Sequence, residues 1–352
     1  MSRKKLSLLL TLVLLLSGCG VGAAEDTPVP TAVPTPAVPT PTPYDGAYNP
    51  LTGLPLLSGS QEDRPIAIML NNLKGALPQL GVSQADIIYE VLAEGGITRM
   101  LGVYQSVEGV GNIGSVRSSR PYYLELALGH DAVYLHAGGS PDAYDKIREW
   151  NVTALDCVNG PYEGTLFWRD SWRRKNLGYE HSVITSGERI TSLFPSYSFR
   201  KQHSKDYYYK MSFTEDGTPV GGQTADTVKV PFSDYKTGVF TYEPEAGTYL
   251  VSEYGKPYVD GNSGEQVEVT NLLILKTRCA NIAGDTYGRI TVELNGGEGW
   301  FACTGKYVPI RWEKGYPDGQ LYYETEDGRS ITLGQGRSYV CIVPTGSAVE
   351  FS

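Results

Sequence analysis

Residues 85–104 read ADIIYEVLAEGGITRMLGVY, and they carry the clearest structural signal in the chain. Two runs rich in β-branched and apolar residues, Ala85–Leu92 and Ile97–Tyr104, flank the pair Gly95-Gly96. Glycine tolerates the positive φ angles of tight turns between antiparallel strands. The stretch therefore predicts a β-hairpin.

Strands and helices are mixed on both sides of this hairpin. Short apolar runs predict strands over Ile66–Leu70 and Asp131–His136. A proline just inside the start and a glycine just past the end predict a helix over Pro121–Leu128. Ser140 is a suitable N-cap for a further helix over Pro141–Trp150. This mixture indicates an α/β domain.

The chain after residue 223 has a different pattern, with short apolar runs bounded by Gly, Asp, Asn or Pro and no useful helical periodicity. Such spacing is typical of an antiparallel β-sandwich or open barrel. We therefore expect an α+β protein, with a mixed α/β domain over residues 50–223 followed by an all-β domain over residues 224–352. The predicted strands are Val228–Phe232, Gly238–Tyr242, Thr248–Tyr254, Leu272–Lys276, Gly288–Leu294, Gly299–Thr304, Lys306–Trp312, Leu321–Glu324 and Ser338–Pro344.

Residues 1–18 are expected to form a signal peptide. Three basic residues precede a leucine-rich run of 11 residues, Leu6–Leu16, and Ser17-Gly18-Cys19 follows. At about 1.5 Å per residue this run is too short to cross a hydrocarbon core of about 30 Å. Small residues directly before a cysteine are typical of a lipobox. We expect cleavage before Cys19 and lipidation of that residue, which would anchor the chain to the outer face of a membrane.

Residues 19–49 are expected to form a stalk behind the lipidated cysteine. Seven of the 17 residues from Thr27 to Pro43 are proline. Proline-rich segments adopt an extended polyproline II helix that rises about 3.1 Å per residue. Such a stalk would hold the folded part away from the membrane.

The charge balance argues against a nucleic-acid partner. The chain has 30 Lys and Arg against 39 Asp and Glu, a formal net charge of −9. Proteins that bind nucleic acids through their general surface carry a basic excess. A site for an anionic partner must therefore be a local cluster of basic residues.

The cysteines specify neither a metal site nor a disulfide framework. Four remain after Cys19, and an extracytoplasmic setting permits disulfides among them without fixing the pairing. No CxxC or CxxH pair occurs, so we predict no metal site, and the sequence names no cofactor. The four cysteines are Cys157, Cys279, Cys303 and Cys341.

Two basic groups in the first domain are candidates for an anion-binding site. Arg117 and Arg120 flank Ser118 and Ser119 at the entrance of a predicted helix. Unpaired N–H groups at a helix start and planar guanidinium groups suit a phosphate or carboxylate. The second group, residues 167–175, reads FWRDSWRRK and contributes Arg169 and Arg174 beside aromatic side chains. The alternative is that these arginines form scaffold ion pairs or seal a loop.

Other polar residues are expected to support this site or to act in catalysis. His136 and His181 are candidate acid or base groups, although a histidine at the end of a strand is more often structural. The residues expected to support the arginines are Asn71, Asn72, Glu90, Glu94, Arg99, Asp142 and Asp170.

Four stretches resemble the YerB-like lipoproteins of Gram-positive bacteria. They are Arg64–Asn72, Gln84–Arg99, Val116–Tyr122 and His136–Pro141. The resemblance covers essentially everything after the stalk. It implies an N-terminal and a C-terminal domain and a location in the cell envelope, and it implies no activity.

Three functional hypotheses follow. In the first, the α/β domain binds an anionic envelope ligand or a wall-synthesis protein through its arginines. In the second, the same Arg and Asp cluster serves a phosphotransferase or hydrolase of the envelope, with His136, His181 or Asp170 as acid or base. In the third, the β domain acts through protein contacts and the polar groups are scaffold.

Overall fold

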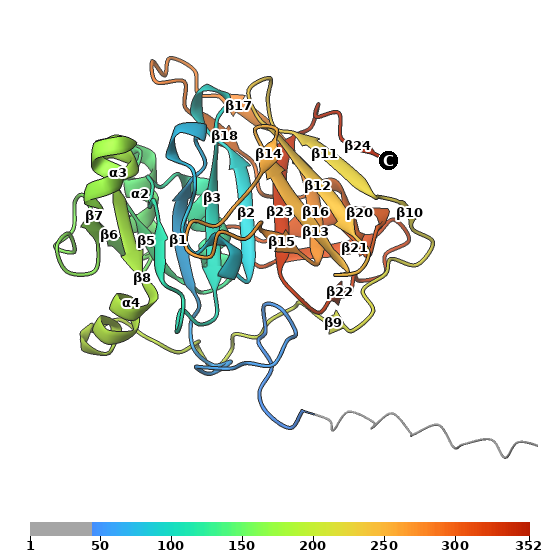
Figure 1. The fold of residues 1–352 in the computed structure, drawn as a ribbon, viewed down its shortest axis with the longest axis horizontal. Coiled ribbons are helices and arrows are strands. Elements are labelled where there is room, and N and C mark those ends of the chain that lie inside the picture. The colour runs from blue at the N-terminus through green and yellow to red at the C-terminus, as the bar shows by residue number, and fades with distance from the viewer. Residues whose placement is uncertain (1–43) are drawn as a thin grey trace, which may run out of the picture. The chain divides into compact units, whose positions relative to one another are not determined.

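One mixed sheet of eleven strands runs through residues 44–352, the part of the chain that the computed structural model describes (Figure 1). The strand order is β10-β20-β19-β16-β23-β2-β3-β1-β5-β6, and β21 pairs with β20. The expected signal peptide, the lipidation at Cys19 and most of the expected stalk lie outside the described residues. The strands of this sheet are β1 (Ile66–Asn71), β2 (Ile87–Leu92), β3 (Thr98–Tyr104), β5 (Val133–His136), β6 (Ala154–Asp156), β10 (Gln223–Thr224), β16 (Asn271–Thr277), β19 (Gly297–Cys303), β20 (Lys306–Lys314), β21 (Leu321–Thr325) and β23 (Ser338–Pro344).

The predicted hairpin is confirmed. Strands β2 and β3 pair antiparallel, with Ile88 opposite Gly102. The turn between them contains Gly95 and Gly96 at φ angles of 66° and 76°, a conformation that other residues adopt only with strain. On the other side of β3 lies β1, which is antiparallel to it and parallel to β5.

Strand β23 joins the two ends of the chain in one sheet. It lies between β2 and β16 and is parallel to both, with Ser338 beside Ile87 on one side and Asn271 on the other. Six of its seven residues are buried, as is typical of parallel strands covered on both faces. The expectation of a purely antiparallel C-terminal region was therefore wrong at this strand.

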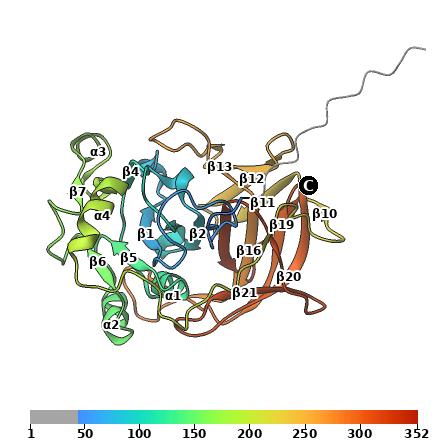
Figure 2. The ribbon, with the colours of Figure 1, turned by 90° about the horizontal axis from the view of Figure 1, so that it is seen from below.

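A second sheet covers one face of the long sheet, so this part is a β-sandwich (Figures 1 and 2). Along β13 every second residue is buried, which is the pattern of a sheet with one face on the core. Between the sheets, the rings of Phe240 and Tyr339 pack edge to face at 5.0 Å. The strands of the second sheet are β11 (Thr227–Pro231), β12 (Thr237–Glu243), β13 (Thr248–Glu253), β14 (Lys256–Pro257), β15 (Glu268–Val269) and β24 (Glu350–Phe351).

Two helices cover the opposite face of the long sheet, as Figure 2 shows. Helix α1 (Pro121–Gly129) buries Tyr122, Tyr123 and Leu124 against it. Helix α2 (Pro141–Glu149) begins at Ser140, whose hydroxyl accepts a hydrogen bond of 3.3 Å from the amide of Ala143. Both predicted helices and the predicted cap are confirmed.

A smaller three-stranded sheet lies beside β1 and β5. It consists of β4 (Asn112–Gly114), β8 (Val183–Ser186) and β7 (Trp168–Arg169), with α3 (Ser171–Asn176) and α4 (Gly187–Leu193) attached. Two further strand pairs are β9 (Phe213–Thr214) with β22 (Leu333–Gly334) and β17 (Cys279–Asn281) with β18 (Ile290–Val292). Within the described residues every α-helix lies between positions 121 and 193. The predicted fold class, a helix-containing N-terminal part before a strand-rich C-terminal part, is confirmed.

Candidate functional site

The ends of β1 and β3 bring Asn71 and Arg99 side by side. These residues are partners in the antiparallel register. The segment after β4 crosses this edge, held by a hydrogen bond of 3.0 Å from the Arg117 amide to the carbonyl of Met69. The guanidinium of Arg99 donates to the carbonyl of Ser118 at 3.0 Å. The two serines and two arginines singled out in the sequence therefore lie next to Arg99.

Glu94 holds two of the predicted arginines. Its carboxylate accepts from Arg120 at 2.6 and 3.1 Å and also pairs with Arg99. Arg120 donates further to the carbonyl of Ser119 at 2.7 Å. Burial would raise the pKa of Glu94, but the two guanidinium groups outweigh it and lower the pKa. Glu94 thus pairs with both arginines, and the trio keeps a net positive charge.

Arg117 and His181 extend the cluster toward the surface. Arg117 pairs with Glu180 at 2.7 Å, and Glu180 is 60% exposed. This hydrogen bond lowers the pKa of the Glu180 carboxyl. The amide of Asn71 contacts Nδ1 of His181 at 2.9 Å. Burial lowers the pKa of His181 and so favours the neutral ring. A neutral ring that accepts from the Asn71 amide at Nδ1 carries its proton on Nε2.

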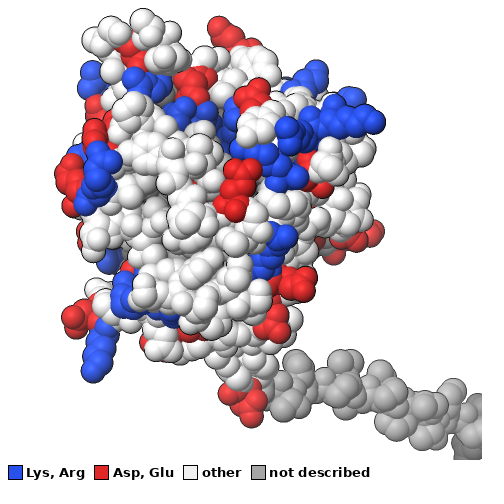
Figure 3. All heavy atoms as spheres, turned by 90° about the vertical axis from the view of Figure 1, so that its left-hand side faces the viewer, with Lys and Arg blue, Asp and Glu red and all other residues white. Residues whose placement is uncertain are grey.

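Arg169 and Arg174 lie over the ring of Tyr179, next to Glu180 in sequence. The guanidinium carbons are 3.7 and 5.3 Å from the ring centroid. Arg169 also pairs with Glu163 at 2.9 Å. Arg174 is exposed and forms no ion pair within residues 44–352. Figure 3 shows the side of the molecule that carries α3 and β7, where Lys and Arg gather in the upper part with acidic side chains between them.

We call the residues Arg99, Arg117, Arg120, Arg169 and Arg174 the arginine cluster. Three carboxylates, Glu94, Glu163 and Glu180, pair with four of its members. Five positive groups thus share three negative ones in a chain whose net charge is −9. Arg117 and Arg169 can bind an anion by exchanging their partners Glu180 and Glu163, which are 60% and 46% exposed, for it. Arg174 has no carboxylate to exchange within residues 44–352.

Asp170 and Asp142 do not face the arginine cluster. The Asp170 carboxylate accepts from the Arg173 amide at 2.7 Å, so it is the N-cap of α3. Asp142 lies 3.5 Å from Arg289 in the C-terminal part. Neither residue is in position to order Arg117 or Arg120.

His136 is buried at the end of β5, away from the arginine cluster. It is 1% exposed, and its Nδ1 contacts the carbonyl of Gly138 at 2.8 Å. Asp156, 3.8 Å away, also accepts from the Gly138 amide and the Tyr144 hydroxyl. Burial lowers the pKa of His136 despite this carboxylate. These contacts fix the turn that leads into α2.

Asn72 and Glu90 belong to a second, buried polar group that the sequence did not reveal. Glu90 contacts Lys236 at 3.1 Å, and Lys236 contacts Glu253 at 2.8 Å. The Asn72 amide donates to Glu90 at 2.8 Å. Lys236 lies in a turn before β12 and Glu253 ends β13, positions that read as surface residues in a sequence. Only the packing of the two sheets brings them together.

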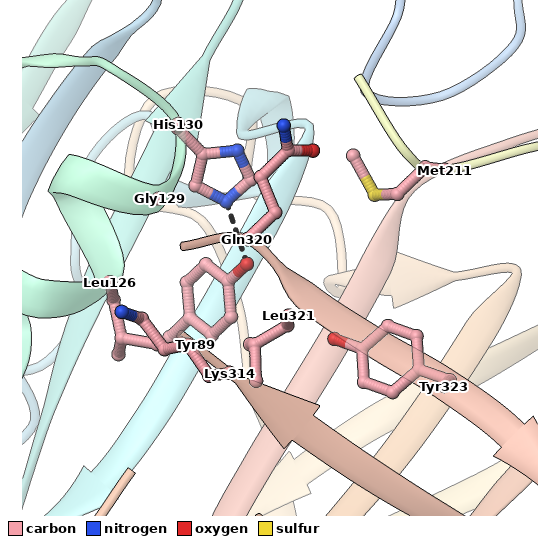
Figure 4. Close-up of a pocket in the computed structure, with 9 residues that line it drawn as sticks. All are labelled: Tyr89, Leu126, Gly129, His130, Met211, Lys314, Gln320, Leu321 and Tyr323. Atoms are coloured by element: carbon pink, nitrogen blue, oxygen red, sulfur yellow. Dashed lines mark hydrogen bonds between the residues drawn. The ribbon is translucent and has the colours of Figure 1, made fainter. Parts of the chain in front are cut away.

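Two hollows within residues 44–352 are lined by residues outside the arginine cluster. One cavity of about 10 Å³ between α1 and β21 has room for no more than one water. Figure 4 shows Tyr89 and His130 pointing toward one another there, with 2.7 Å between the hydroxyl and Nε2. A hollow of about 300 Å³ is lined by Leu77, Pro78, Tyr254 and Tyr258. It borders the buried polar group.

Residues 44–352 contain no group of three or more His, Cys, Asp or Glu side chains arranged to hold a metal ion. No helix in the same residues is long and apolar enough to span a membrane. The cysteines Cys157, Cys279, Cys303 and Cys341 are free thiols. Burial raises the pKa of Cys157 to about 12 and that of Cys303 to about 11, so neither is a reactive thiolate.

Comparison with known proteins places these features in a family. Residues 51–200 match the N-terminal domain, and residues 228–340 the C-terminal domain, of the family described as protein of unknown function DUF3048. The lipoprotein YerB of Bacillus subtilis (strain 168) is 31% identical over 316 residues, which is 86% of this chain and 88% of the relative. The chain belongs to the YerB-like family. The family prediction made from the sequence is confirmed.

The fold of this chain is similar to that of a YerB protein of known structure. The crystal structure of YerB from Bacillus subtilis superposes with a TM-score of 0.73 at 26% sequence identity. The superposed region covers 86% of this chain and 99% of the crystallised chain. The relationship supports a lipoprotein of unknown function. Its two family domains share one continuous sheet through β23, and the boundary near residue 223 stays a prediction.

Proposed function

We propose that this lipoprotein, anchored on the outer face of the membrane, binds an anionic cell-envelope ligand through the arginine cluster. The single observation that carries the proposal is the surplus of guanidinium groups over carboxylates at one edge of an acidic protein. Arg174 is the exposed member and has no carboxylate partner in residues 44–352. Arg117 is 18% exposed and becomes accessible when its exposed partner Glu180 moves away. The chemistry fits the phosphates of a wall polymer or of a lipid-linked precursor.

The ring of Tyr179 supports this use of the cluster. Its face lies against the guanidinium groups of Arg169 and Arg174, and such cation–π contacts help to hold arginine side chains in place. Trp172, which is 58% exposed on α3, offers a second aromatic face nearby in sequence. Aromatic faces beside arginines favour a ligand with both sugar and phosphate groups.

Binding of purified wall teichoic acid, and separately of inorganic pyrophosphate, tests the proposal. We expect the double substitution Arg117→Gln and Arg174→Gln to weaken teichoic acid binding about 10-fold or more, since each charge-assisted hydrogen bond contributes roughly 1 kcal/mol or more. Binding should also weaken as salt rises. The matched control is Arg278→Gln, which removes an exposed arginine that pairs with Glu293 in the C-terminal part. Equal affinities of all three proteins would refute the proposal.

A second candidate function is phosphotransfer or hydrolysis at the same cluster. The contact between Asn71 and His181 favours it, because a neutral histidine with a fixed proton lies beside Arg117. Asp170, the other expected acid or base, caps α3 instead. His181→Gln separates the two functions: a catalytic role predicts lost turnover of a phosphate ester with binding intact, and a binding role predicts no turnover in either protein.

A further inference from the structure

A fully buried lysine lies between two buried glutamates where the second sheet covers the long sheet. The side chains of Lys236 and Glu90 are 0% exposed and that of Glu253 is 1% exposed. Nζ of Lys236 is 3.1 Å from Oε1 of Glu90 and 2.8 Å from Oε1 of Glu253. Burial of three charged groups is costly unless their hydrogen bonds are complete.

The side-chain amide of Asn72 occupies the same place. Its nitrogen is 2.8 Å from Oε1 of Glu90 and 3.2 Å from Oε1 of Glu253. The lysine amine and the asparagine amide therefore contact the same two carboxylate oxygens. Asn72 is itself 0% exposed, so no solvent separates the two nitrogen-bearing groups from their shared acceptors.

The hydrogen bonding of this group is incomplete at the reactive atoms. Nζ of Lys236, despite its two ion pairs, has no hydrogen bond of acceptable geometry, and Oδ1 of Asn72 and Oε2 of Glu253 have no partner. Buried polar atoms are nearly always satisfied, and each exception calls for an explanation. A group that served only as an ion-pair network would be expected to satisfy them.

We propose that Lys236 and Asn72 are joined by an intramolecular isopeptide bond that Glu90 and Glu253 promote. The amine is the nucleophile, the amide carbon Cγ of Asn72 is the electrophile, and the unpartnered Oδ1 is the oxygen that a protonated carboxyl would polarise. In water an amine and an amide react very slowly, because nothing holds them together and no group transfers the protons. Here the amine and the amide are held next to carboxyl groups that can transfer protons.

The reaction balances with the groups present. The Lys236 ammonium first gives one proton to Glu253, and the neutral amine adds to Cγ of Asn72. As the Nζ–Cγ bond forms, the carboxylate of Glu90 takes a further proton from Nζ. The tetrahedral intermediate collapses, the Cγ–Nδ2 bond breaks, and the leaving nitrogen takes a proton from Glu90. Ammonia leaves, one proton stays on the glutamate pair, and the total charge of the site is unchanged.

The surroundings of Lys236 and Asn72 favour these proton transfers. Burial raises the pKa of Glu253 to about 7, so it can carry a proton. Burial would lower the pKa of Lys236, but the two glutamates outweigh it and raise the pKa. The neutral amine is therefore a minor form, and we expect bond formation to be slow after folding. Glu253 and Tyr254 line the hollow of about 300 Å³, which gives ammonia a way out.

The bond would tie the end of β1 to the start of β12 and so connect the two family domains covalently. Its test is peptide mass spectrometry of the purified full-length protein, aged under folding conditions and then denatured and digested with trypsin. We expect a branched peptide that joins the segments around Asn72 and Lys236, uncleaved at Lys236 and lighter by about 17 Da, the mass of ammonia. Unlinked Asn72 peptides with complete cleavage after Lys236 would overturn the proposal without any variant.

Three substitutions check the chemistry. Lys236→Arg keeps the positive charge without the amine nucleophile, and Glu253→Gln keeps the shape of the glutamate without its proton transfer; both should abolish the branched peptide. Asn72→Asp should instead lose water, about 18 Da, if the same atoms react. A branched peptide that persists in Lys236→Arg would place the link at another lysine and overturn the assignment.

Discussion

Asp131 accepts hydrogen bonds from basic side chains that come from distant parts of the chain. Arg200 binds both carboxylate oxygens at 2.6 and 2.8 Å, and His203 binds one of them at 3.0 Å. The Nε of Arg64 lies 3.3 Å away. Burial would raise the pKa of Asp131, but these contacts outweigh it and lower the pKa to about 2. This one residue thus ties the segment around 200 to the end of α1.

The lowered pKa makes the contribution of Asp131 dependent on pH. The ordinary pKa of 3.8 lies above the folded value, so the folded state binds fewer protons between these two values. The stabilisation is present above about pH 4 and is lost as the pH falls through 2. We expect Asp131→Asn to lower the free energy of unfolding at pH 7 by about 1 to 2 kcal/mol, allowing for partial exposure.

Urea unfolding at a series of pH values measures this effect. The difference between the native protein and Asp131→Asn should shrink as the pH falls from about 4 to about 2. Asp145→Asn, which removes an exposed partner of Arg148, should have almost no effect at any pH. A difference that is independent of pH would show that Asp131 acts through its neutral shape and not through its charge.

The arginine cluster shows what residue-level reasoning can and cannot find. Arg117 and Arg120 are recognisable because they flank two serines before a proline that begins a helix, a local pattern. Their partners are not local: Glu94 is 26 residues from Arg120, and Glu180 is 63 residues from Arg117. Sequence alone therefore indicated basic residues but not which of them a carboxylate already neutralises.

At the scale of elements, the short helix α3 depends on its cap. It has six residues, too few to be stable alone. Asp170 accepts from the Arg173 amide at its start, and Arg173, 3% exposed, donates to the carbonyls of Ala76, Pro78 and His181. The cap and this anchor together hold Arg174 over Tyr179.

This predicts different results for two substitutions of Asp170. Asp170→Ala removes the cap and should lower the free energy of unfolding by about 1 kcal/mol, and it should weaken teichoic acid binding because Arg174 is no longer held. Asp170→Asn retains a capping oxygen and should preserve both properties. Calorimetry and the binding assay measure them. If Asn were as damaging as Ala to binding, the negative charge of Asp170 would matter directly and the capping explanation would fail.

The elements themselves were largely predictable, and their pairing was not. The hairpin around Gly95-Gly96 and the helices at Pro121 and Pro141 have local signals: turn residues, caps and a run of one periodicity. Strand β23 was also visible as an apolar run. Its neighbours β2 and β16 lie far from it in sequence, and no local pattern specifies a partner at such a distance. The buried Lys236 group was missed for the same reason, since it exists only where the two sheets meet.

At the scale of residues 44–352, β23 makes the two family domains mechanically interdependent. If it unpaired, β2 and β16 would each present an open edge, with unsatisfied backbone groups in the interior. Apolar side chains of both regions also share two common cores on the two faces of the long sheet. The C-terminal part is therefore needed to complete the N-terminal part.

Such a structure should unfold as one unit, and a cavity in one region should weaken the other. Leu273 in β16 is 1% exposed and belongs to the C-terminal part. We expect Leu273→Ala to cost about 2 to 5 kcal/mol, and hydrogen exchange in dilute urea should report the same loss of protection in β1 and β3 as in β19 and β20. Val220→Ala, at a position that is 83% exposed, is the control and should change neither. Loss of protection confined to β19 and β20 would contradict this expectation. It would mean that destabilisation of β16 does not pass through β23 to β1 and β3.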